Sequence, residues 1–162
     1  MGNNTGEITI VSETHNGKYQ VEAKVGSGAA FLIDEPVAAG GLGSGPNPYN
    51  LLSAAVGACT TMTIRLYADR KGWPLTDVRT AVRHSRAGLQ AKDVFELDIA
   101  LEGALDDSQR ARLMEIAEHC PVHLTLARGS EVRAALMPAA MPPIQPQDGS
   151  GHMACMVEAC AD

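Results

Sequence analysis

The chain has 162 residues, of which 45% are hydrophobic and 20% are charged, enough to bury the core of one compact domain. Its net charge of −6 argues against nucleic acid as a partner, because an acidic surface repels phosphate backbones. No apolar run approaches the roughly 20 residues that span a bilayer, and the N-terminus lacks the pattern of a signal peptide. We therefore expect a cytoplasmic protein with no membrane partner.

The first part of the chain has the composition of a β-meander. Residues 8–13, 18–25 and 29–34 are β-prone, and the turn-forming runs THNG and GSG separate them. A loop rich in Gly and Pro follows at 37–48 and ends the meander. The pattern predicts three short strands.

A long helix is predicted next, with Asn47 as its N-cap, Pro48 at its first position and Gly72 as its stop. Apolar residues recur along it at helical spacing: Leu51, Leu52, Ala55, Val56, Cys59, Met62 and Leu66. Cys59 is therefore expected on the apolar face, as a buried small hydrophobe or as a nucleophile. The small residues beside it permit close packing or access for a small substrate.

The second half predicts strands over 78–85 and 94–103, then a helix over 108–120 that Asp106 or Asp107 caps. Because Pro121 suits the first position of a helix, Cys120 is expected to be the N-cap of a third, short helix. A last strand is predicted over 130–137.

Cys120 is the second candidate reactive residue. The positive end of a helix dipole lowers the pKa of a cysteine and favours its thiolate. His119 and His123 flank Cys120 and either add to this effect or only satisfy helix ends.

The C-terminal residues 137–162 form a predicted linker and tail beyond a domain at 1–136. The tail carries the sulfur and imidazole groups of His152, Met153, Cys155, Met156 and Cys160. A Cu(I) or zinc site and a dithiol relay are both open, although the Cys spacing matches no standard zinc pattern. We favour a loosely packed chain end, or in part a remnant of expression given GSGHM, and expect the tail to be dispensable for chemistry.

Two motifs together carry a family resemblance. NPYNLLSAAVGACTTM, followed some sixty residues later by EHCPVH, resembles the osmotically inducible protein C and organic hydroperoxide resistance (OsmC/Ohr) family. The resemblance implies an α+β, OsmC-like two-layer fold, in which a homodimer interleaves antiparallel sheets around central helices. It implies no metal and no organic cofactor.

The resemblance also implies a thiol-dependent peroxidase. Cys59 would attack an organic hydroperoxide and become a sulfenic acid, Cys120 would convert it to a Cys59–Cys120 disulfide, and a dithiol reductant, lipoyl-type or similar, would reset it. The alternative is a non-catalytic OsmC-like binding module for an apolar small molecule or a lipoyl-type group.

The sequence departs from the peroxide-reducing members at the residues that activate the thiolate. Their N-terminal arginine is absent, and Tyr49 and Asn50 stand where their glutamate falls, as possible supporting residues. Lys18 is expected on the surface of a hairpin, and Arg65 is expected to pair with a surface carboxylate. The chain thus resembles the OsmC-like branch in which the activating residues vary.

Overall fold

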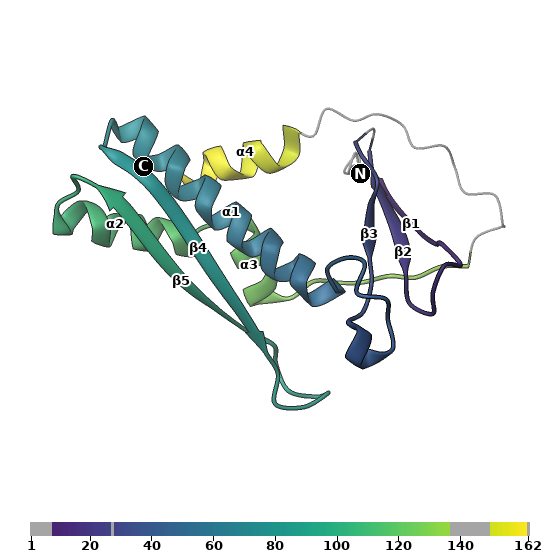
Figure 1. The fold of residues 1–162 in the computed structure, drawn as a ribbon. Coiled ribbons are helices and arrows are strands. Elements are labelled where there is room, and N and C mark those ends of the chain that lie inside the picture. The colour runs from purple at the N-terminus through teal and green to yellow at the C-terminus, as the bar shows by residue number, and fades with distance from the viewer. Residues whose placement is uncertain (1–7, 27, 137–149, 162) are drawn as a thin grey trace. The chain divides into compact units, whose positions relative to one another are not determined.

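A computed structural model describes residues 8–26, 28–136 and 150–161 (Figure 1). The chain divides into two units, one of residues 1–51 with 131–151 and the other of residues 52–130 with 152–162. Whether residues 1–136 fold as a domain without the tail stays a prediction.

The first unit contains the predicted meander. Strands β1 (Thr9–Glu13), β2 (Val21–Val25) and β3 (Phe31–Ile33) form an antiparallel sheet in the order β1-β2-β3. A short 3₁₀ helix, η1 (Val37–Ala39), lies in the following loop. The three predicted strands are confirmed, each within three residues of its predicted bounds.

Buried Asp34 organises the Gly- and Pro-rich loop after β3. Its carboxylate accepts hydrogen bonds from the backbone of Leu42 and Ser44 and from the Ser44 hydroxyl. Burial by itself raises the pKa of Asp34, but these bonds together with one from the Glu35 backbone hold it below its usual value. The ionised carboxylate thereby fixes the loop that leads into the long helix.

Helix α1 (Pro48–Lys71) begins and ends where the sequence predicts. The Asn47 side chain accepts a hydrogen bond from the Asn50 backbone at 2.9 Å, and Gly72 follows the helix with a φ of 64°. By length and composition α1 could cross a membrane, which the reading of the sequence missed, but the core helix of a soluble protein passes the same test.

The buried face of α1 differs from the predicted one. Leu52 and Met62 are 42% and 52% exposed. The buried residues are Val56, Gly57, Cys59, Thr60, Thr63, Ile64, Tyr67 and Ala68. Apolar and small residues surround most of the helix, so periodicity selects no single face. Thr63 is buried at low cost because its hydroxyl donates to the Cys59 carbonyl at 2.8 Å.

The second unit places a two-stranded sheet and three helices with α1. Strands β4 (Leu75–Ser85) and β5 (Val94–Gly103) are antiparallel. Helices α2 (Asp107–Glu118), α3 (Pro121–Arg128) and α4 (Ser150–Ala159) follow. Asp106 and Gln109 form a capping box at α2, and Cys120 is the N-cap of α3, as predicted. The core joins α1, β4, α2 and the residue directly after α4 through Ile64, Tyr67, Ala68, Leu75, Val78, Leu113, Ile116, Ala117 and Cys160.

Two expectations about the C-terminal part are wrong. Residues 130–136 of the predicted last strand have no regular secondary structure, because a strand exists only where a neighbour pairs with its backbone; Met137 lies outside the described residues. The tail is not loosely packed either. It forms α4, in which Met156 is only 2% exposed, and Cys160 directly after the helix is only 3% exposed.

Candidate active site around Cys59

Two thiols that are 61 positions apart in the chain meet inside the second unit. Cys59 lies on α1 with 2% of its surface exposed, and Cys120 is fully buried where α2 ends and α3 begins. Both are free thiols, and Cys120 lies close enough to Cys59 to act on its pKa. The fold therefore brings the two candidate reactive cysteines together.

The surroundings of Cys59 act on its pKa in opposite directions. Burial raises the pKa of the thiol to about 11, and the Cys120 side chain adds to the rise. A hydrogen bond from the Val122 backbone lowers it, as does the Thr63 side chain. Val122 lies in the first turn of α3, so the helix N-terminus is directed at the sulfur of Cys59.

A third side chain reaches Cys59 from the C-terminal helix. The His152 Nε2 lies 3.3 Å from the Cys59 Sγ, within reach of a hydrogen bond to sulfur. α4 is held on α1 by two further contacts, from the Cys160 thiol to the Thr63 carbonyl and from the Arg70 guanidinium to the Val157 carbonyl. The sequence placed His152 in the tail cluster and missed this contact, because no local pattern reports a contact across 93 positions.

The proposed metal cluster of the tail is not assembled. His152 approaches Cys59, Cys155 is exposed, and Cys160 is buried against α1. Among the described residues, no three His, Cys, Asp or Glu side chains gather into a group that could hold a metal ion. The structure therefore gives no support to a Cu(I) or zinc site in the tail.

The two histidines beside Cys120 have other surroundings. The ring of His119 is 2.8 Å from the Glu115 carbonyl through its Nδ1, an arrangement that satisfies the end of α2. His123 is half-buried and lines a pocket with Phe95 and Leu97 of β5. The simpler reading, in which a histidine satisfies a helix end, fits His119.

The residues considered as possible activators of Cys59 lie at the start of α1 or on the surface. Tyr49 and Asn50 lie in the first turn of α1, about 14 Å before Cys59 along the helix axis at 1.5 Å per residue. Arg65 forms an ion pair with Asp69 at 3.6 Å, which confirms its predicted surface partner. Lys18 is exposed over the Tyr19 ring, as expected for a hairpin lysine.

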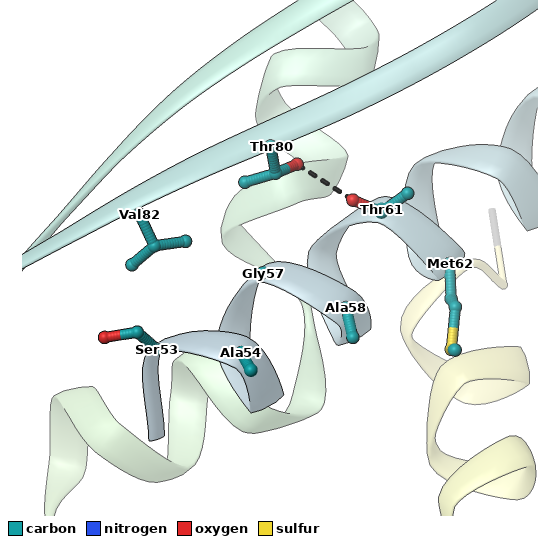
Figure 2. A pocket seen from close by; sticks show the side chains of 8 residues that line it. All are labelled: Ser53, Ala54, Gly57, Ala58, Thr61, Met62, Thr80 and Val82. Carbon is teal, nitrogen blue, oxygen red and sulfur yellow. Dashed lines mark hydrogen bonds between the residues drawn. The ribbon is translucent and has the colours of Figure 1, made fainter. Parts of the chain in front are cut away.

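A shallow pocket of about 500 Å³ lies between α1 and β4 (Figure 2). The Thr61 and Thr80 hydroxyls bond at 2.9 Å across it, and Met62 points away from the strand. A Cβ at Gly57 would lie 3.0 Å from a Val82 methyl group, so this glycine permits the close approach of helix and strand. Cys59 is not among the side chains that line this pocket.

Three solved structures share this fold at low identity. An OsmC-like protein from Mycoplasma pneumoniae is 17% identical with a TM-score of 0.61, over 78% of this chain and 89% of that one. Organic hydroperoxide resistance proteins from Legionella pneumophila and Elizabethkingia anophelis are 23% and 19% identical, with TM-scores of 0.54 and 0.58. Each comparison covers 77% of this chain and 91% of the other.

No curated protein matches the chain. The family described as OsmC-like protein, in contrast, matches residues 41–135, a stretch that contains both Cys59 and Cys120. The predicted α+β fold and the predicted family are therefore confirmed, and this chain belongs to the OsmC-like protein family.

Proposed function

We propose that the protein is a thiol-dependent peroxidase that reduces organic hydroperoxides. The observation that supports this function best is the proximity of two free, buried thiols, with the N-terminus of α3 directed at one of them. A structural cysteine needs no second thiol beside it. The organic hydroperoxide resistance proteins of the same fold make this substrate class the first to test.

The proposed reaction has two chemical steps and a reset. The Cys59 sulfur attacks the distal oxygen of the hydroperoxide, so that an S–O bond forms, the O–O bond breaks and an alcohol leaves after taking up a proton. The Cys120 thiol then attacks the Cys59 sulfenic acid, which gives a disulfide and water. An external dithiol, lipoyl-type or similar, reduces the disulfide to the starting thiols. The reacting groups of the protein are the two cysteine sulfurs, and no step uses a metal or an organic cofactor.

We also propose a cytoplasmic homodimer with sheets interleaved between the chains. Large apolar side chains stay exposed on both units, among them Val11, Phe31, Leu52 and Met62. Their burial in a partner would stabilise both copies. Sedimentation at low micromolar concentration tests this proposal, and a stable monomer of 17.0 kDa would contradict it.

The decisive test of the peroxidase is stoichiometric. One equivalent of cumene hydroperoxide should produce a Cys59–Cys120 disulfide, identified by mass spectrometry of the digested protein. With excess dithiothreitol or dihydrolipoamide, the same protein should then consume hydroperoxide catalytically. A Cys59 that stays a thiol after stoichiometric hydroperoxide rules this function out.

One observation favours a second function, that of a binding module. A thiol with a pKa of about 11 is ionised in only about one molecule in ten thousand at pH 7, which opposes nucleophilic attack. The fold would then hold an apolar small molecule or a lipoyl-type group without turnover. An inert Cys59 together with saturable binding of lipoamide would establish this alternative.

A further inference from the structure

We propose that helix α4 supplies the proton acceptor of the Cys59 thiol, and that His152 is this residue. The inference rests on the peroxidase proposed above and identifies how the buried sulfur becomes a nucleophile. It assigns a catalytic role to a segment outside the stretch that matches the family, which ends at residue 135.

The geometry of the contact carries the proposal. The His152 Nε2 and the Cys59 Sγ are 3.3 Å apart, so a proton can pass directly between them. Imidazole is the side chain that accepts and returns protons near neutral pH. The contact is anchored, because the Val157 carbonyl of the same helix and the Cys160 thiol directly after it both bond to α1.

Because the rest of the site opposes ionisation of Cys59, attack by its sulfur requires a proton acceptor, and His152 is in position to be one. Burial opposes ionisation of Cys59, and the neighbouring Cys120 thiol opposes it further. The α3 N-terminus favours a thiolate but accepts no proton. A base in contact with the sulfur removes the proton as the S–O bond forms, so that no free thiolate needs to accumulate beforehand.

In the oxidation of Cys59, His152 both accepts the thiol proton and returns it to the leaving group. His152 Nε2 takes the Cys59 proton while the sulfur attacks the distal oxygen, and the O–O electron pair goes to the alkoxide. The imidazolium then protonates that alkoxide, which leaves as an alcohol. His152 ends neutral, Cys59 ends as a sulfenic acid, and the hydroperoxide is the oxidant consumed.

Other titratable groups on the packed elements engage elsewhere. From the position just before α3, Cys120 acts on Cys59. Several described groups on α1, α3 and α4 have their own surroundings: Arg65 pairs with Asp69, Tyr67 accepts a hydrogen bond from Arg112 and lies under Lys71, Arg70 lies near Cys160, His123 lines the β5 pocket, and Arg128, Cys155 and Glu158 line a pocket between α3 and α4.

The test measures the reactivity of Cys59 without using peroxide. The rate of Cys59 alkylation by iodoacetamide, resolved by peptide mass spectrometry, is followed from pH 6 to pH 11 in the wild type and in His152→Ala. We expect His152→Ala to slow alkylation at pH 7 by about tenfold or more. The two rates should converge near pH 11, where the thiol ionises without a base.

Two controls separate proton transfer from packing. Added imidazole should restore part of the rate to His152→Ala, since residue 152 is exposed enough for a small base to enter. Met153→Ala changes the neighbouring exposed residue of α4 and should leave the pH profile unchanged. A defect that arises only from a displaced helix would leave the two rates apart even near pH 11 and would not respond to imidazole.

Several results would overturn the proposal. They are an unchanged pH profile in His152→Ala, faster alkylation in that variant, and a wild-type Cys59 that does not react at pH 7. The failure of the peroxidase function is distinguishable from these results. If alkylation depends on His152 but the protein does not turn over hydroperoxide, His152 is the proton acceptor and the peroxidase function is wrong. If the protein turns over hydroperoxide but alkylation does not depend on His152, the peroxidase function stands and the role of His152 is wrong.

Discussion

The two pairs of cysteines in this chain differ in a way that sequence distance does not reveal. Cys59 and Cys120 are 61 positions apart and lie close together, whereas Cys155 lies in α4, Cys160 directly follows it, and the two have different surroundings. Cys155 is exposed beside a pocket, and Cys160 is buried with its thiol donating to the Thr63 carbonyl.

Helix geometry explains the divergence of the tail pair. Five residues of helix correspond to about 500° of rotation, so the Cys155 side chain and that of the residue at the end of α4 are directed about 140° apart. A disulfide needs sulfur atoms about 2 Å apart and Cβ atoms about 4 Å apart, which such positions do not provide within a helix. Cys59 and Cys120 instead belong to different elements that meet at the N-terminus of α3.

The largest expected effect separates the pairs by activity. Cys59→Ser should lower hydroperoxide turnover by about a thousandfold or more, because a serine hydroxyl is not an adequate nucleophile at this position. Turnover is measured by hydroperoxide consumption with dithiothreitol, and circular dichroism shows that the fold survives. Cys155→Ser is the matched control and should retain turnover; a loss in both variants would make the tail part of the electron path.

The next effect distinguishes the two members of the reactive pair. Cys120→Ser should still undergo one oxidation and leave a sulfenic acid on Cys59 that dimedone traps. Excess hydroperoxide should drive this species to sulfinic acid, because no resolving thiol is present. The measurement is the mass of the Cys59 peptide. An unoxidised peptide, or a dimedone adduct on Cys155, would contradict these roles.

The raised pKa of Cys59 predicts a loss of stability in alkali. Between pH 9 and about 11 the unfolded thiol loses its proton while the folded thiol keeps it, so the unfolding free energy falls as pH rises. Below pH 9 both states are protonated and the group contributes no pH dependence. The expected fall in the unfolding free energy is on the order of 2 kcal/mol. Below pH 9 the difference in stability between the wild type and Cys59→Ser should therefore not change with pH on account of this group.

Urea denaturation at pH 8 and pH 11 measures this effect. Cys59→Ser should lose less stability than the wild type across the interval, since serine does not titrate there. Cys160 is also buried, which raises its pKa against the opposing effect of Arg70, so part of the slope should remain in this variant. Equal slopes in the two proteins would show that burial does not hold the Cys59 proton.

Much of the fold could be predicted because its signals are local. Asn47, Pro48 and Gly72 bound α1 by capping chemistry, and Asp106 with Gln109 begins α2 in the same way. The resemblance of the two cysteine motifs predicted their family, and the N-cap position of Cys120 followed from Pro121. Signals of this kind act within a few residues and need no knowledge of the tertiary structure.

The parts that sequence did not predict depend on contacts between distant segments. The buried face of α1 was only partly predicted, because Leu52 and Met62 are as apolar as the residues that are buried. The contact of His152 with Cys59 depends on α4 packing on α1, which no spacing indicates. The tail was therefore expected to be dispensable, and the position of His152 now leads us to expect that truncation after Leu136 impairs Cys59.

The smallest expected effect returns to the tail pair, where burial and not reactivity separates the two cysteines. Cys160→Ala removes a buried thiol and its bond to the Thr63 carbonyl, so it should lower the unfolding free energy by about 1 kcal/mol or more. Cys155→Ala, on the exposed side of the same helix, should change it by less than about 0.5 kcal/mol. Urea denaturation at pH 7 gives both values in one experiment. If the two substitutions cost the same, α4 does not pack on α1 through Cys160, and the anchoring of His152 beside Cys59 loses its basis.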